Sequence, residues 1–144
     1  MADEHIIELV RADGLTLIAK GDSGHWVTLD SAPEFDGYDA ATRPFELFLT
    51  SIAGCTAMDV LSILKKMKVD VRDFRMKLSA KRRNEHPKVP TEIKIKYIFK
   101  GEKLPKNMIE KAIRLSQDKY CSVSAVVKMA GIPVKWSYKL IQGE

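Results

Sequence analysis

The chain has 144 residues, of which 45% are hydrophobic and 30% are charged, and its formal net charge is +5. This length suits one domain over residues 1–144, and no basic segment followed by an apolar one marks a secretory leader. Most lysines and arginines alternate with apolar residues, as on the solvated face of a sheet, which argues against nucleic-acid binding. Two cysteines without a leader predict reduced thiols and a cytoplasmic location.

Three short strands are expected near the N-terminus. Residues 4–10 and 15–20 are rich in β-forming side chains and flank the sequence RADG, whose Asp-Gly pair favours a hairpin turn. Residues 25–30 form the third strand. Residues 30–43 contain Pro, Gly and several Asp, so we expect a loop there, and loops of this length in a compact domain are often functional.

A long apolar helix is expected from Pro44 to about Lys68. Pro44 suits the first turn of a helix, and Glu46 lies in the same turn, where the helix dipole favours an acid. The apolar run is long enough to be considered as a membrane span, but it contains Glu46 and Asp59, and acidic residues near the centre of a bilayer are costly. We therefore interpret it as a buried helix and expect no membrane partner.

The rest of the chain alternates strands and helices. Alternating apolar residues predict strands over 71–82 and 92–100, joined by a turn. Residues 104–120 carry an apolar face at helical spacing, and a short third helix is expected to end near Gly131. A last strand is expected over 134–140. This order predicts an α+β fold, with a mainly antiparallel sheet packed on the long helix.

The two cysteines occupy contrasting positions. Cys55 lies inside the apolar helix, and Cys121 lies at the junction of the two later helices. A buried cysteine is most often a small hydrophobic side chain, so inert packing is the ordinary interpretation of each. The sequence has no CxxC pair and its three histidines are scattered, so we expect no structural metal and no cofactor.

The segment PFELFLTSIAGCTAMDVL, followed further along the chain by CSVSAVVK, resembles the OsmC/Ohr family of osmotically inducible and organic-hydroperoxide-resistance proteins. The resemblance covers most of the chain, and the two cysteine segments in this order and at this separation are more specific than either one alone. It implies the OsmC/Ohr-like α+β fold. It also implies an intertwined homodimer with the central helices packed inside and the active sites at the interface.

The resemblance further implies a thiol peroxidase, an antioxidant oxidoreductase that reduces organic hydroperoxides. Cys55 matches the family's peroxidatic cysteine, whose thiolate attacks the O–O bond and becomes a sulfenic acid. Cys121 matches the resolving cysteine, which forms a disulfide with Cys55 that an external dithiol must then reduce. The alternative is a non-catalytic protein that binds a lipid or another small molecule in the family's apolar interface pocket.

The cation that would activate the thiolate is harder to locate. The family uses an arginine held by a glutamate, but the corresponding N-terminal stretch here, KGDSGHW, has no arginine, and Phe45 occupies the usual glutamate position. Glu46 and Arg43 are the candidate replacements. Glu46 lies nine residues before Cys55, so a continuous helix would put the two on opposite faces, about 13 Å apart along its axis.

Two interpretations of this pair remain open. Arg43 or Glu46 of a partner chain could approach Cys55 across antiparallel central helices. Alternatively, Glu46 is a first-turn residue favoured by the helix dipole, with Arg43 as its surface partner. Asp59, one turn after Cys55 on the same face, would disfavour the Cys55 thiolate unless a cation lies nearby.

Overall fold

The computed structural model describes residues 3–143 and contains two compact units, Met1–Phe48 and Leu49–Glu144. The boundary between them lies within helix α1 (Pro44–Lys66), which is assigned as one helix across it. The expectation of a single domain over residues 1–144 therefore stays a prediction.

The first unit contains an antiparallel sheet in the order β1-β2-β3. Its strands are β1 (Glu8–Asp13), β2 (Thr16–Lys20) and β3 (Trp26–Leu29). The hairpin turn is formed by residues 14–15, so β1 continues through most of the RADG sequence in which the turn was expected. Gly14 has φ +55, and a Cβ at this position would come within 2.7 Å of the Tyr38 ring, so both conformation and space favour glycine.

Asp30 organises the loop that follows β3, which also contains the short 3-10 helix η1 (Pro33–Phe35). Its Oδ2 atom accepts hydrogen bonds from the Thr16 hydroxyl at 2.9 Å and from the backbone N–H groups of Tyr38 at 3.3 Å and Ala40 at 3.1 Å. Its Oδ1 atom accepts from the Ser31 N–H at 2.7 Å. Burial raises the pKa of the Asp30 carboxyl, but these hydrogen bonds outweigh burial and hold its pKa below the ordinary value.

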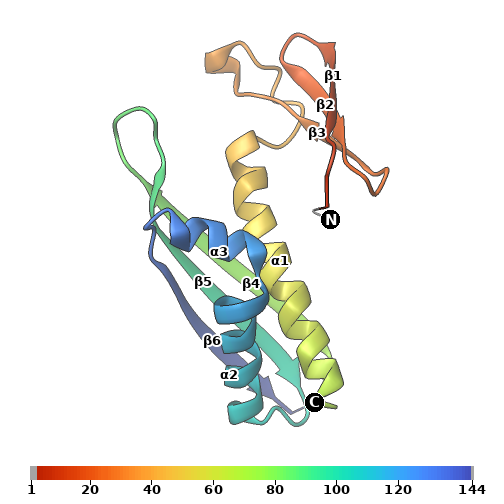
Figure 1. Ribbon diagram of the computed structural model, residues 1–144, viewed down its shortest axis with the longest axis vertical. Helices are drawn as coiled ribbons and strands as arrows, with labels where there is room; N and C mark the ends of the chain where they lie inside the picture. The colour runs from red at the N-terminus through yellow and green to blue at the C-terminus, as the bar shows by residue number, and fades with distance from the viewer. Residues whose placement is uncertain (1–2, 144) are drawn as a thin grey trace. The chain divides into compact units, whose positions relative to one another are not determined.

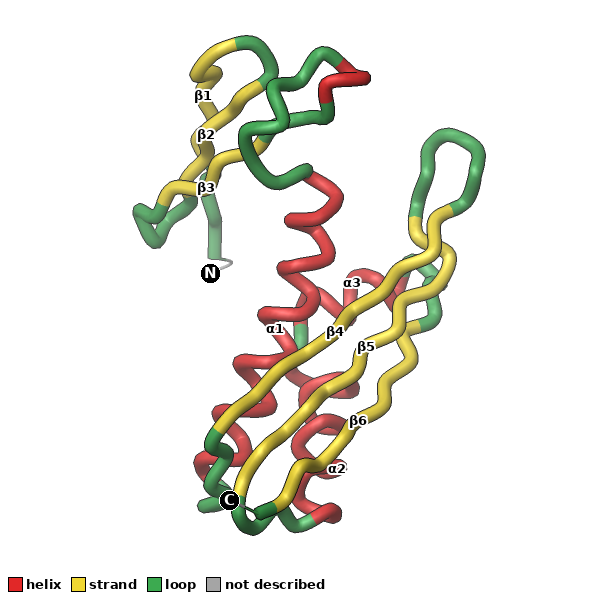
Figure 2. The backbone as a smooth tube through the Cα atoms, turned by 180° about the vertical axis from the view of Figure 1, so that it is seen from behind, coloured by secondary structure: helices red, strands yellow, loops and turns green. Residues whose placement is uncertain are grey.

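The second unit is a three-stranded sheet covered on one face by helices (Figures 1 and 2). The strands are β4 (Asp73–Arg82), β5 (Pro90–Gly101) and β6 (Val134–Gln142), and the later helices are α2 (Lys106–Leu115), the π-helical turn η2 (Ser116–Tyr120) and α3 (Ser122–Met129). β4 pairs antiparallel with β5, whereas β6 pairs parallel with β5. The parallel pair needs a long crossover connection, which α2, η2 and α3 supply.

The core of this unit lies between the sheet and its helices. Alternate residues of β5 face inward, and Tyr97 and Phe99 are fully buried there. α1 contributes residues at helical spacing, including Ile52 and Val60, which are fully buried in the same cluster. Burial of side chains of this size contributes about 1.5–3 kcal/mol each.

α1 is long and apolar enough, by length and composition, to be a candidate membrane span. The core helix of a globular protein meets the same criterion, and the buried face of α1 belongs to the core cluster just described. The helix ends where Lys68 takes the left-handed conformation at φ +60 and the Val69 N–H bonds back to the Leu64 carbonyl at 2.9 Å. It therefore ends within two residues of the expected position.

Candidate active site at the two cysteines

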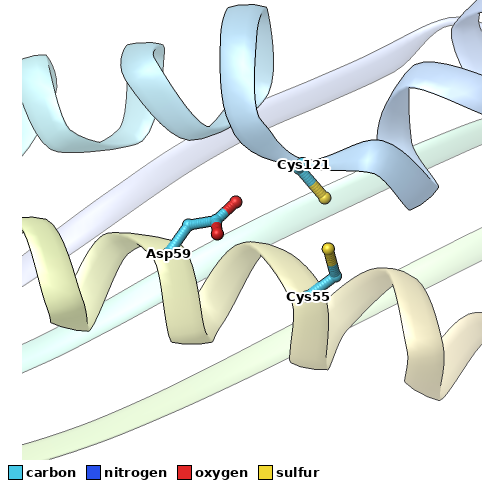
Figure 3. A group of neighbouring side chains, drawn as sticks. All are labelled: Cys55, Asp59 and Cys121. Atoms are coloured by element: carbon cyan, nitrogen blue, oxygen red, sulfur yellow. The ribbon is translucent and has the colours of Figure 1, made fainter. Parts of the chain in front are cut away.

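The structure brings the two cysteines together from separate elements of the second unit. Cys55 lies near the middle of α1, and Cys121 lies between η2 and α3, as the N-cap of α3. Their sulfur atoms point toward one another, with the Asp59 carboxylate beside them (Figure 3). Both Sγ atoms and a carboxylate oxygen of Asp59 lie within 4.8 Å of one another, and both cysteines are free thiols.

The two thiols differ in their surroundings. Cys55 is half-buried, whereas Cys121 is 2% exposed. The Cys121 thiol donates to the Ser124 hydroxyl at 3.2 Å, and its sulfur accepts from the Ser124 N–H at 3.4 Å. Burial raises the pKa of the Cys121 thiol, Ser124 lowers it because its N–H and, after rotation, its hydroxyl can donate to the thiolate, and the neighbouring Cys55 thiol raises it, with a net rise. Near neutral pH, Cys121 is therefore held mainly as the protonated thiol.

A buried cluster of polar side chains lies beside the cysteines. Thr56 Oγ1 is 2.7 Å from Tyr97 OH and 2.8 Å from Ser116 Oγ. Gln117 Nε2 donates to the Thr56 and Tyr97 oxygens at 3.1 and 3.0 Å. Ser116 Oγ donates to Asp59 Oδ2 at 3.0 Å. The cluster links α1, β5 and η2, and so holds the segment before Cys121 against the helix that carries Cys55.

The hydroxyl protons of this cluster can be assigned in order. Because Ser116 donates to Asp59, its oxygen must accept the Thr56 proton, and Thr56 must then accept from Tyr97. All three protons therefore point toward the Asp59 carboxylate. Burial raises the pKa of Tyr97, which keeps its donor proton in place. Among the described residues, the one buried side-chain atom without a partner is Gln117 Oε1.

An open pocket of about 530 Å³ lies beside Asp59. Most of its lining side chains are apolar or aromatic, and the charged groups in it are Asp59 and Lys66. The full lining is Met58, Asp59, Ser62, Ile63, Lys66, Met67, Leu115 and Tyr120. Asp59 thus belongs both to this pocket and to the thiol pair.

Arg43 and Glu46 belong to the first unit and make hydrogen bonds within it. Arg43 Nη2 donates to Asp39 Oδ1 at 2.6 Å, and Nη1 donates to the Ala41 carbonyl at 2.8 Å. Glu46 Oε1 accepts from the Arg43 backbone N–H at 2.9 Å, a bond that caps the start of α1. The Arg43 side chain therefore pairs with Asp39, and a surface pairing of Arg43 with Glu46 stays an open interpretation. A role for Arg43 or Glu46 at Cys55 of a partner chain stays a prediction.

Sequence reasoning did not identify the cluster of Thr56, Tyr97, Ser116 and Gln117. A signal for part of it was present. Thr56 lies four residues from both Ile52 and Val60, on the apolar face of α1, and Tyr97 is at an inward position of an alternating strand. A polar group at such a position needs a hydrogen-bond partner. Nothing in the local sequence, however, indicated that those partners would come from residues 116–117.

A model of the OsmC-like protein family matches residues 37–137. The chain belongs to the OsmC family. Protein YhfA of Escherichia coli K12 is 36% identical over 129 residues, which cover 90% of this chain and 92% of that protein. The crystal structure of a hypothetical protein from Aquifex aeolicus VF5 has a TM-score of 0.86 and 36% identity, over 99% of this chain and 100% of that one.

A more distant structure has the same fold. An organic hydroperoxide resistance protein, OsmC, from Legionella pneumophila has a TM-score of 0.69 at 17% identity, over 96% of this chain and 98% of that one. The expected OsmC/Ohr membership and the OsmC/Ohr-like α+β fold are therefore confirmed. The name of the Legionella protein refers to organic hydroperoxide resistance, which is a property of that protein.

Proposed function

We propose that this chain is a cytoplasmic thiol-dependent peroxidase that reduces organic hydroperoxides. The observation that carries the proposal is the approach of two free sulfur atoms, from α1 and from the start of α3, to within 4.8 Å. A disulfide needs an S–S distance of about 2.05 Å, so a small movement of either segment would close the bond. Family membership and its association with peroxide resistance support the same activity.

The different surroundings of the thiols support different roles. Cys55 is the more accessible thiol, and we assign it the attack. Its thiolate bonds to one peroxide oxygen, the O–O bond breaks, an alcohol leaves after protonation, and Cys55 becomes a sulfenic acid. The Cys121 sulfur then attacks the Cys55 sulfur, the S–O bond breaks, and the Cys121 proton and the departing hydroxyl leave as water. An external dithiol reduces the resulting disulfide.

The proposed functional unit is a homodimer. The apolar side chain of Met58 is 74% exposed on α1. A second copy of the chain packed on this helix would cover it. We expect Met58→Glu to lower the fraction of dimer in analytical ultracentrifugation, whereas Lys65→Glu near the end of the same helix should not. A wild-type chain that is monomeric at micromolar concentration would contradict the dimer.

The peroxidase is tested with reduced protein, cumene hydroperoxide and dithiothreitol. Peroxide consumption should be lost in Cys55→Ser. In Cys121→Ser, dimedone should trap one sulfenic acid per chain, at Cys55. Stoichiometric peroxide should remove two thiols per wild-type chain without cross-linking the chains. Consumption that persists in Cys55→Ser, or disulfides formed only between chains, would overturn the assigned roles.

A second candidate function is the non-catalytic binding of an apolar small molecule. The pocket beside Asp59 favours it, because its volume of about 530 Å³ is that of a typical ligand site and its walls are mostly apolar. Binding of a fluorescent fatty acid to the Cys55→Ser, Cys121→Ser double variant, in a chain without peroxidase activity, would favour this function. Loss of such binding in Leu115→Glu would assign it to this pocket.

A further inference from the structure

We propose that Cys55, Asp59 and Cys121, with both thiols reduced, form a binding site for a thiophilic dication of the zinc class. The three residues supply two sulfur ligands and one oxygen ligand from α1 and from the N-terminus of α3 (Figure 3). This departs from the expectation of no metal, which rested on spacing along the chain. The proposal does not depend on the peroxidase activity.

The donor atoms have nearly the separation that such an ion requires. Zinc binds sulfur at about 2.3 Å and carboxylate oxygen at about 2.0–2.2 Å, so tetrahedral ligands lie about 3.5–3.8 Å apart. The three donor atoms here lie within 4.8 Å of one another, so a contraction of about 1.3 Å at most would bring them to the ion. A fourth position would remain for water or another small ligand.

Hydrogen bonds already orient two of the three ligands. The Ser116 hydroxyl donates to Asp59 Oδ2, and Thr56 in turn lies 2.8 Å from Ser116 Oγ. At Cys121, the Ser124 N–H donates to Sγ, and the Ser124 hydroxyl can turn to donate once the thiol proton is gone. Outer-shell bonds of this kind fix ligand geometry at metal sites and strengthen metal binding.

The donor set selects among cations. Two sulfur ligands favour zinc and cadmium over magnesium and calcium, which prefer oxygen ligands alone. With both thiols ionised, the three ligands carry three negative charges within 4.8 Å, and a dication removes most of that repulsion. Of two lysines on this unit, Lys128 donates from Nζ to the Gln117 carbonyl at 2.6 Å, and Lys66 lines the same pocket as Asp59.

Metal binding and disulfide formation should exclude one another. A disulfide between Cys55 and Cys121 would remove both sulfur ligands, leaving Asp59 alone. A bound dication would conversely occupy both sulfur atoms and slow their alkylation. Oxidation by diamide, which converts two thiols to a disulfide and is itself reduced to the hydrazine, should therefore release the metal, with no hydroperoxide involved.

The proposal is tested by titrating the reduced full-length protein with Zn²⁺ under anaerobic conditions in a calorimeter. Cd²⁺ provides a second readout through its thiolate-to-metal absorption in the ultraviolet. We expect one ion per chain and protection of both thiols from iodoacetamide. Cys55→Ser and Cys121→Ser should each weaken binding at least about 100-fold, and Asp59→Asn about 10–100-fold. Asp70→Asn, an exposed carboxylate on the same unit, is the matched control and should bind as the wild type does.

Two results would overturn the site. One is the absence of saturable Zn²⁺ binding by the reduced wild-type chain. The other is wild-type affinity in a folded Asp59→Asn variant, which would leave a two-thiol site only. If Asp59→Asn does not fold, Ser116→Ala keeps all three ligands but loses the bond that orients Asp59, and it should weaken Zn²⁺ binding while the thiol count stays at two. Unchanged affinity in that variant would count against the three-ligand geometry. Failure of the peroxidase proposal would leave all these readouts unaffected.

Discussion

Each of the two units contains a buried polar centre, and the two centres are built differently. In the first unit, the charged Asp30 accepts hydrogen bonds from three backbone N–H groups and one hydroxyl. In the second, neutral side chains form hydrogen bonds with one another, and one of them, Ser116, donates to the Asp59 carboxylate. The neutral side chains are those of Thr56, Tyr97, Ser116 and Gln117. The first arrangement satisfies the backbone of one loop, whereas the second joins side chains of three elements.

Hydrogen bonds to a buried polar group can fix the conformation of one loop, or they can fix the packing of elements that are far apart in the sequence. Three of the four donors to Asp30 are within ten residues of it, so its effect is mainly local. The partners of Thr56 are 41 to 61 residues away along the chain, so their bonds fix how α1 meets β5 and η2. Removing a member of each centre should therefore have different consequences.

The largest effect is expected from Thr56→Val, which keeps the side-chain shape but removes a hydroxyl with three partners. Tyr97, Ser116 and Gln117 would each lose a bond in a buried site, so the free energy of unfolding should fall by about 1–3 kcal/mol. Urea denaturation measures this. Thr91→Val, at an exposed position of β5, is the matched control and should change stability by no more than about 0.5 kcal/mol. Equal effects of the two substitutions would show that the cluster does not stabilise the unit.

Asp30→Ala should act on the first unit alone. The backbone N–H groups of Ser31, Tyr38 and Ala40 would lose their acceptor, so the loop should open more often. Hydrogen exchange of these amides should accelerate about tenfold or more, while amides of β5 keep their protection. Asp36→Asn, in the same loop, serves as the control, because asparagine tolerates the left-handed conformation that residue 36 adopts at φ 66. Uniform acceleration across both units would contradict the local role.

A smaller effect of the same kind is expected from acid. The pKa of Asp30 is lower in the folded chain than its ordinary value of about 3.9, so its contribution to stability is complete above that value. It is lost as the pH falls through the lower pKa of the folded state, when Asp30 becomes protonated. Exchange in the loop should therefore rise, relative to β5, as the pH falls below about 4. In Asp30→Asn this acid-dependent rise should be absent.

The smallest effect is expected from Gln117→Met. The substitution removes two donated hydrogen bonds but also removes Oε1, a buried acceptor without a partner among the described residues. The lost hydrogen bonds destabilise the folded chain, whereas the loss of an unpaired buried acceptor stabilises it. The free energy of unfolding should therefore change by less than about 1 kcal/mol, well below the change in Thr56→Val. Urea denaturation of both variants in parallel measures the difference. A larger loss in Gln117→Met would mean that a buried water or another group satisfies Oε1.

The sequence by itself determined the order of the elements and the OsmC/Ohr resemblance. Helix α1, the strands of the second unit and the position of Cys121 between two helices follow from local patterns, because apolar spacing, Pro44 and turn residues act over a few residues. The π-helical turn at residues 116–120 was not foreseen, because its hydrogen-bond pattern differs from that of an α-helix without a distinct sequence signal.

Only the tertiary structure decided how Cys55, Asp59 and Cys121 meet. Cys121 is 66 residues from Cys55 in the sequence, and the approach of their side chains depends on the crossover from β5 to β6 and on how α1 packs over the sheet. The polar cluster was hidden for the same reason: its bonds join residues whose local patterns carry no information about one another. Local propensity fixes which residues share one face of an element, whereas long-range packing fixes which faces come into contact.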